Sequence, residues 1–115
     1  MIVQIDYELG RILDWLDESG QARSTVVIFM SDHGEMPGDH GIVLKGCRLC
    51  EGAMHVPLIV SWPGQVAEDN RYDAHVELMD IVPTLCEAAG LDVPYYVQGP
   101  SLWPQLRRHR HGASF

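Results

Sequence analysis

The sequence is poor in positive charge. Its 115 residues include eight lysines and arginines against sixteen aspartates and glutamates, so its net charge is −8 when the histidines are neutral. Nonspecific nucleic-acid binding depends on neutralising phosphates, and we therefore expect no nucleic-acid partner. An anionic ligand would have to be held by local positive charge, such as a metal ion or a single lysine.

Cysteines and long apolar runs are also scarce. Three cysteines do not suggest a disulfide framework. No run of eighteen apolar residues occurs, so we expect no membrane span. Residues 1–20 have the pattern of a charged helix rather than of a secretion signal. These absences leave a globular chain, because the 46% of apolar residues is too high for a disordered one.

The first half of the chain predicts a helix followed by a strand. Apolar residues recur every three or four positions from Ile2 to Leu16, which is typical of an amphipathic helix, and Gly20 is a plausible end for it. Residues 25–30 form a continuous apolar, β-branched run, which predicts a strand buried on both faces. A helix so close to such a strand favours a layered α/β sheet.

The second half predicts one more strand and one more long helix. The strand covers residues 56–61 and ends in a turn at Pro63-Gly64. Asp80 is the expected N-cap of a helix that runs to Ala89. We expect one incomplete domain over residues 1–106 and a basic, disordered tail over residues 107–115.

A polar, glycine-rich loop follows the first predicted strand. It opens with Ser31-Asp32-His33-Gly34-Glu35 and reaches Lys45-Gly46. In an open α/β sheet, ligands bind just beyond the carboxyl ends of strands, and Asp32 comes two residues after such an end. A carboxylate and an imidazole side by side suit Mn²⁺, Zn²⁺ or Ca²⁺ with further oxygen ligands. The alternative is that the Asp-His pair caps a helix or decorates a surface loop.

Other polar groups in this loop have less specific roles. His40 could contact substrate or support the metal site, while Glu35 and Asp39 are expected to be solvated or to orient the ligands. Cys47 and Cys50 have Cys-x-x-Cys spacing, which is typical of zinc or thiol-redox sites. No second pair of cysteines accompanies them, which disfavours both kinds of site.

Short motifs occur in a fixed order along most of the chain. They are Ser31-Asp32-His33-Gly34-Glu35, Gly38-Asp39-His40-Gly41, Lys45-Gly46, Glu51-Gly52, Val56-Pro57-Leu58-Ile59-Val60, Pro63-Gly64, Asp80, Pro83-Thr84-Leu85, Ala89-Gly90 and Gly99-Pro100-Ser101-Leu102. This series resembles the C-terminal part of the catalytic domain of formylglycine-dependent sulfatases, in the alkaline-phosphatase superfamily.

The resemblance implies a fold and three site residues. The fold would be part of an α/β/α layered sheet domain of the alkaline-phosphatase type. Asp32 and His33 would be metal ligands, with Ca²⁺ favoured by the family and Mn²⁺ or Zn²⁺ possible. Lys45 would be catalytic by binding the sulfate oxygens of a small-molecule or carbohydrate sulfate ester.

The resemblance also implies an incomplete active site. The family's nucleophile is a formylglycine made from the motif Cys/Ser-x-Pro/Ala-x-Arg, which is expected upstream; none of the three cysteines here has the required Pro and Arg after it. We therefore expect the chain alone to be inactive. Phosphate or phosphonate ester hydrolysis on the same fold, and a truncated non-catalytic remnant, stay open as alternatives. So do the oligomeric state and the compartment, cytoplasm or periplasm, of a longer parent protein.

Overall fold

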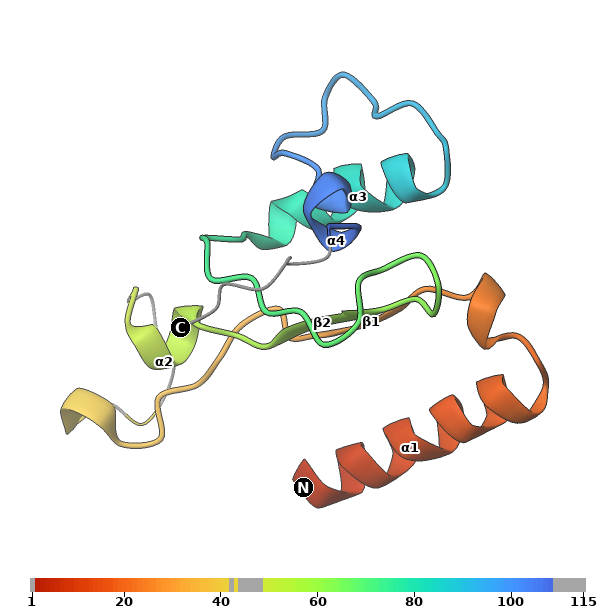
Figure 1. The fold of residues 1–115 in the computed structure, drawn as a ribbon. Coiled ribbons are helices and arrows are strands. Elements are labelled where there is room, and N and C mark those ends of the chain that lie inside the picture. The colour runs from red at the N-terminus through yellow and green to blue at the C-terminus, as the bar shows by residue number, and fades with distance from the viewer. Residues whose placement is uncertain (1, 42, 44–48, 109–115) are drawn as a thin grey trace, which may run out of the picture.

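A computed structural model describes residues 2–41, 43 and 49–108 and shows a small α/β unit (Figure 1). The longer elements alternate along the chain, and three 3-10 turns lie between them. The helices and strands are α1 (Ile2–Glu18), β1 (Val27–Met30), α2 (Glu51–Met54), β2 (Leu58–Ser61), α3 (Ile81–Ala88) and α4 (Trp103–Leu106). The turns are Ala22–Ser24, Asp39–Gly41 and Leu78–Asp80. The α/β class predicted from the sequence is confirmed.

Helix α1 ends as the sequence predicts. Gly20 has a φ of 71°, a left-handed conformation that costs glycine little, and the Gln21 amide donates to the Leu16 carbonyl at 2.9 Å. Leu16 is the buried residue of this helix. The apolar stripe N-terminal to it is largely exposed, so the amphipathic pattern forms the helix without burying most of its apolar face.

The sheet has two antiparallel strands. β1 and β2 pair in register from Val27 with Ser61 to Met30 with Leu58. The prediction of a strand buried on both faces is wrong for this chain, because β1 is half-buried and its last residue is exposed. Burial of both faces requires covering layers on both sides of a sheet. In the described part of the chain, α3 packs on α4 and on the turn before it rather than on the strands.

The segment from residue 77 to residue 106 forms a small packed unit. Asp80 is the N-cap residue of α3, as predicted, but its side chain makes no capping bond within α3. It is also the third residue of a helical turn that starts at Leu78. Its Oδ2 accepts a hydrogen bond from the Glu77 amide at 2.9 Å, and the Glu77 side chain accepts one in return. The Thr84 hydroxyl donates to the Asp80 carbonyl at 2.5 Å and accepts from the Leu102 amide at 2.7 Å. We call residues 77–106 the threonine-anchored unit.

Two tryptophans join this unit to the sheet. Trp62 follows β2 and donates from Nε1 to the Arg23 carbonyl at 2.8 Å, while its ring lies 5.7 Å from that of Trp103. Arg107 places its guanidinium 5.7 Å from the centre of the Trp103 ring. The first residue of the expected tail thus contacts the domain, whereas residues 109–115 lie outside the described residues. No helix in the described ranges has the length and hydropathy needed to cross a bilayer.

Candidate metal site

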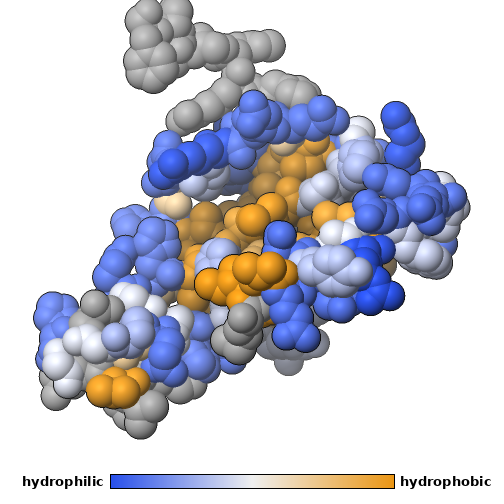
Figure 2. Space-filling model, turned by 90° about the horizontal axis from the view of Figure 1, so that it is seen from below, coloured by the Kyte–Doolittle hydropathy of each residue, from blue (hydrophilic) through white to orange (hydrophobic). Residues whose placement is uncertain are grey.

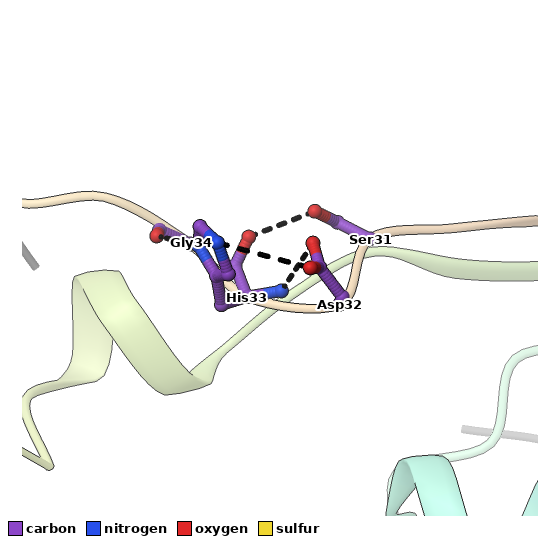
Figure 3. Close-up of polar contacts among 4 residues, drawn as sticks. All are labelled: Ser31, Asp32, His33 and Gly34. Atoms are coloured by element: carbon purple, nitrogen blue, oxygen red, sulfur yellow. Dashed lines mark hydrogen bonds and ion pairs between the residues drawn. The ribbon is translucent and has the colours of Figure 1, made fainter.

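The candidate ligands lie in a sharp turn directly after β1 (Figure 3). The Ser31 hydroxyl donates to the His33 carbonyl at 2.8 Å, and the His33 amide donates to Asp32 Oδ1 at 3.0 Å. Both bonds join neighbours in the sequence, so the turn is set by local polar groups. They bring the Asp32 carboxylate and the His33 ring to the same side of the turn.

The orientation of the His33 ring follows from its contact with the backbone. Nδ1 lies 2.7 Å from the Gly34 carbonyl oxygen, which can only accept a hydrogen bond. The ring therefore donates from Nδ1 to this carbonyl, and the bond holds the ring in place. A histidine ring oriented through its other nitrogen by a carbonyl is a common arrangement for metal ligands.

The spacing of the two candidate ligand atoms suits a shared cation. Asp32 Oδ2 lies 3.8 Å from His33 Nε2, too far for a direct hydrogen bond. Two ligands bound at about 2.0–2.5 Å to one ion lie about 3–4 Å apart. The Asp32 side chain is 84% exposed and the His33 side chain 43%, so both are accessible from outside the described fold.

A second exposed acid–histidine pair shows a different geometry. Glu51 Oε1 lies 2.6 Å from His55 Nδ1 across one turn of α2, and these side chains are 86% and 77% exposed. This distance is a hydrogen bond, with no room for an ion between the two atoms. His55 lies between α2 and β2.

Gly34 fixes the turn against α2. Its amide donates to the Ala53 carbonyl at 2.8 Å. A Cβ built on Gly34 would lie 1.9 Å from the Gly52 carbonyl oxygen, a distance that real Cβ atoms do not show. The φ of Gly34 is not in the left-handed region, so glycine is needed here because two backbones approach closely. The two glycines, Gly34 and Gly52, are the sequence signal from which this contact could have been predicted.

The other predicted groups contribute less. Glu35 accepts a hydrogen bond from the Met36 amide at 3.1 Å and so stabilises its own turn. His40 is exposed and left-handed, with a φ of 54°. Cys50 is a half-buried free thiol that precedes α2. The described residues do not include Lys45, Cys47 or the side chain of Asp39. The role of Lys45 in binding sulfate therefore stays a prediction.

Two ligands are a partial set for any of the expected metals. Within the described ranges, no three side chains of His, Cys, Asp or Glu gather closely enough to hold an ion. Structural and catalytic zinc sites take at least three protein ligands, and calcium takes six to eight oxygens. The Asp32–His33 pair therefore fits part of a divalent-metal site, and it requires further ligands from outside the described residues.

Comparison with known proteins gives this pair its context. The sulfatase family profile matches residues 1–91. Relatives include an arylsulfatase of Clostridium perfringens, 39% identical over 104 residues, and arylsulfatase K of Xenopus laevis, 35% identical over 106 residues. These alignments cover 88% and 92% of this chain but only 21% and 19% of the relatives.

The solved structures agree with the sequence relatives. The structure of BT4656 in complex with its substrate D-glucosamine-2-N,6-O-disulfate superposes with a TM-score of 0.85 and 30% identity over 92% of this chain. A putative sulfatase from Bacteroides thetaiotaomicron superposes with a TM-score of 0.66 and 32% identity over 76%. This chain spans about a fifth of each of those chains. It belongs to the sulfatase family.

Proposed function

We propose that this chain supplies two metal ligands and one anion-binding lysine to a sulfatase that hydrolyses sulfate esters. Asp32 and His33 are the ligands, and Lys45 is the lysine that binds the sulfate oxygens. The carrying observation is the 3.8 Å separation of Asp32 Oδ2 and His33 Nε2 at the end of β1. Membership of the sulfatase family supports the reaction class.

The chemistry follows from charge. A sulfate ester is an anion, and this chain has a net charge of −8, so the ester must meet positive charge at one place. A bound divalent ion, Ca²⁺ by family and otherwise Mn²⁺ or Zn²⁺, would supply Lewis acidity toward the sulfate oxygens. The Asp32 carboxylate lowers the net charge of that site, and the His33 ring is oriented by the Gly34 carbonyl. Lys45 adds a compact positive charge.

A sulfated sugar is the substrate class we favour. BT4656 was solved with a disulfated glucosamine as its substrate, and this chain superposes on it closely. The nucleophile motif Cys/Ser-x-Pro/Ala-x-Arg does not occur around any cysteine of these 115 residues. The reaction therefore needs a nucleophile from outside this sequence, and the purified chain should not turn over p-nitrophenyl sulfate.

Metal binding tests the proposal directly. Calorimetric titration of the full chain with Ca²⁺, Mn²⁺ or Zn²⁺ should give weak binding, because two ligands cannot complete a shell of four to eight. Asp32→Ala or His33→Ala should remove that binding. Glu51→Ala and His55→Ala are the controls, since they change the second exposed acid–histidine pair, and they should leave the metal binding unchanged. A tight stoichiometric site that survives both loop variants would refute the assignment.

Lys45 is tested in a sulfatase domain that carries this chain in place of its own matching region. Lys45→Ala should lower kcat/KM by roughly two to three powers of ten, the effect of removing one preorganised donor, about 2.7–4 kcal/mol. Lys45→Arg should rescue only part of this loss, because a guanidinium is planar and larger. An unchanged kcat/KM in Lys45→Ala, alongside an inactive Asp32→Ala, would make Lys45 a surface lysine.

A further inference from the structure

A pocket opens between β2 and the loop that follows it. Its volume is about 480 Å³, a size typical of sites for small molecules. β2 and the loop supply its apolar walls, and its polar lining consists of Ser61, Trp62, Glu68, Asp69, Asn70 and Arg71. This mixture of an aromatic ring with several polar groups differs from the apolar surface that crosses the middle of the molecule in Figure 2.

The loop wall of the pocket is tied to the rest of the fold. The Ala67 amide donates to the Leu106 carbonyl at 2.8 Å. Asn70 Nδ2 donates to the Arg108 carbonyl at 3.1 Å. Between these two ties lies Asp69, whose φ of 50° is uncommon for a residue with a side chain. Because such backbone outliers are concentrated at functional sites, this wall is a candidate binding surface.

The lining suits the surface of an uncharged sugar. The Trp62 ring is held by the bond from Nε1 to the Arg23 carbonyl and by its contact with Trp103. The apolar C–H face of a pyranose can pack on such a fixed ring. The carboxylate of Asp69 accepts hydrogen bonds and the guanidinium of Arg71 donates them, whereas a sugar hydroxyl does both. Two neighbouring hydroxyls can therefore satisfy both side chains.

The charge of the pocket disfavours an anion. Glu68 and Asp69 bring two negative charges to the lining, and Arg71 brings one positive charge. Arg71 is itself paired with a further acid, since its Nε lies 2.8 Å from Asp73 Oδ1. This excess of carboxylates would repel a sulfate or phosphate group but not an uncharged ligand.

We propose that this pocket binds an uncharged sugar unit, separately from the metal site. The two sites lie at opposite ends of the sheet, because Ser61 at the end of β2 pairs with Val27 at the start of β1, whereas Asp32 follows the end of β1. The inference goes beyond the proposed function and does not depend on it. In a sulfatase that acts on glycans, the pocket would hold a unit of the glycan that carries no sulfate.

The test is an NMR titration of the full chain. Its three tryptophans give three indole N–H signals, and Trp62→Phe identifies the one from Trp62. The probes are the neutral trisaccharides cellotriose, maltotriose and chitotriose. We expect at least one of them to shift the Trp62 signal saturably. The signal of Trp15 should stay unchanged, because Trp15 belongs to α1 and lies outside the pocket.

Two variants of the pocket should weaken this binding. Arg71→Ala removes a charged donor, with an expected loss of about tenfold or more in affinity. Asp69→Gly removes a carboxylate and keeps a residue suited to positive φ, with a loss of similar size. Arg11→Ala is the control for Arg71→Ala and should leave the affinity unchanged. Arg11 is also exposed and paired with a nearby acid, but it lies outside the pocket.

Each outcome decides the proposal. A saturable shift that both pocket variants weaken, and that Arg11→Ala leaves unchanged, supports it. No saturable shift, or one that either pocket variant leaves unchanged, overturns it. Tighter binding of N-acetylglucosamine 6-sulfate than of N-acetylglucosamine also overturns it, because the pocket would then be an anion site. Asp32→Ala should bind the trisaccharides as the wild type does, so a failure of the metal assignment would leave this proposal intact.

Discussion

The loop that follows β1 and the threonine-anchored unit each contain an aspartate beside the end of an element, with opposite surroundings: Asp32 follows β1 and Asp80 precedes α3. Asp32 has an 84% exposed side chain, and its hydrogen bond from the His33 amide lies within one turn. Asp80 is 4% exposed, and its unit is tied by the bond from Leu102 to Thr84, eighteen residues apart. One aspartate is available to bind a ligand, and the other stabilises a helix start. Exposure and the range of the contacts, rather than residue type, separate the two roles.

The loop nevertheless has one contact that is not local. The Gly34 amide donates a hydrogen bond to α2, and the backbone of α2 occupies the space that a Gly34 side chain would fill. The chemical groups of the loop are therefore exposed, while the backbone beneath them is held by tertiary packing. Three substitutions test this division, and each is measured as a change in the free energy of unfolding of the full chain by urea titration.

The largest effect is expected for Gly34→Ala. The new methyl group would lie 1.9 Å from the Gly52 carbonyl oxygen, so the loop or α2 must move, at a cost of about 3 kcal/mol or more. Loss of the cooperative transition would also fit, because the core is small. Gly10→Ala is the control, since nothing lies within 4 Å of its Cβ and a helical alanine should add about 0.5–1 kcal/mol. Equal effects from both substitutions would show that α2 does not hold the loop.

A smaller loss is expected for Thr84→Val. The hydroxyl serves two backbone groups, and its removal leaves the buried Leu102 amide without its acceptor, at a cost of about 1–3 kcal/mol. Thr84→Ser keeps the hydroxyl and should retain most of the stability. Hydrogen exchange at the Leu102 amide should accelerate in the valine variant alone. A valine variant as stable as the wild type would remove the basis for the threonine-anchored unit.

The smallest effect is expected for Asp32→Ala, within about 0.5 kcal/mol in the absence of metal. The Asp32 side chain is exposed, and its bond to the His33 amide can be replaced by water. The same variant should lose the metal affinity of the chain, so stability and binding are expected to separate at this residue. A loss of stability as large as that of Thr84→Val would mean that Asp32 is structural, and the comparison of the two aspartates would fail.

The sequence by itself determined the order of the elements and the place of the candidate ligands. These elements depend on local signals: the periodicity of α1, the apolar runs of β1 and β2, and Gly20. Local backbone preferences are enough to turn such signals into helices, strands and turns. Asp32 and His33 could be placed after β1 because the chemistry of adjacent residues does not depend on distant partners. The motif series, read in order, was enough to predict the family.

Only the tertiary structure decided which groups are buried and how far apart the interacting atoms lie. β1 is only half-buried although its sequence is apolar, because burial depends on the elements that pack against a strand. The described sheet consists of two strands and lacks a covering layer on each face. The contact of Gly34 with Gly52, and that of Thr84 with Leu102, each join segments eighteen residues apart. The difference between 3.8 Å in the Asp32–His33 pair and 2.6 Å in the Glu51–His55 pair is likewise set by backbone geometry, one pair lying in a turn and the other on a helix.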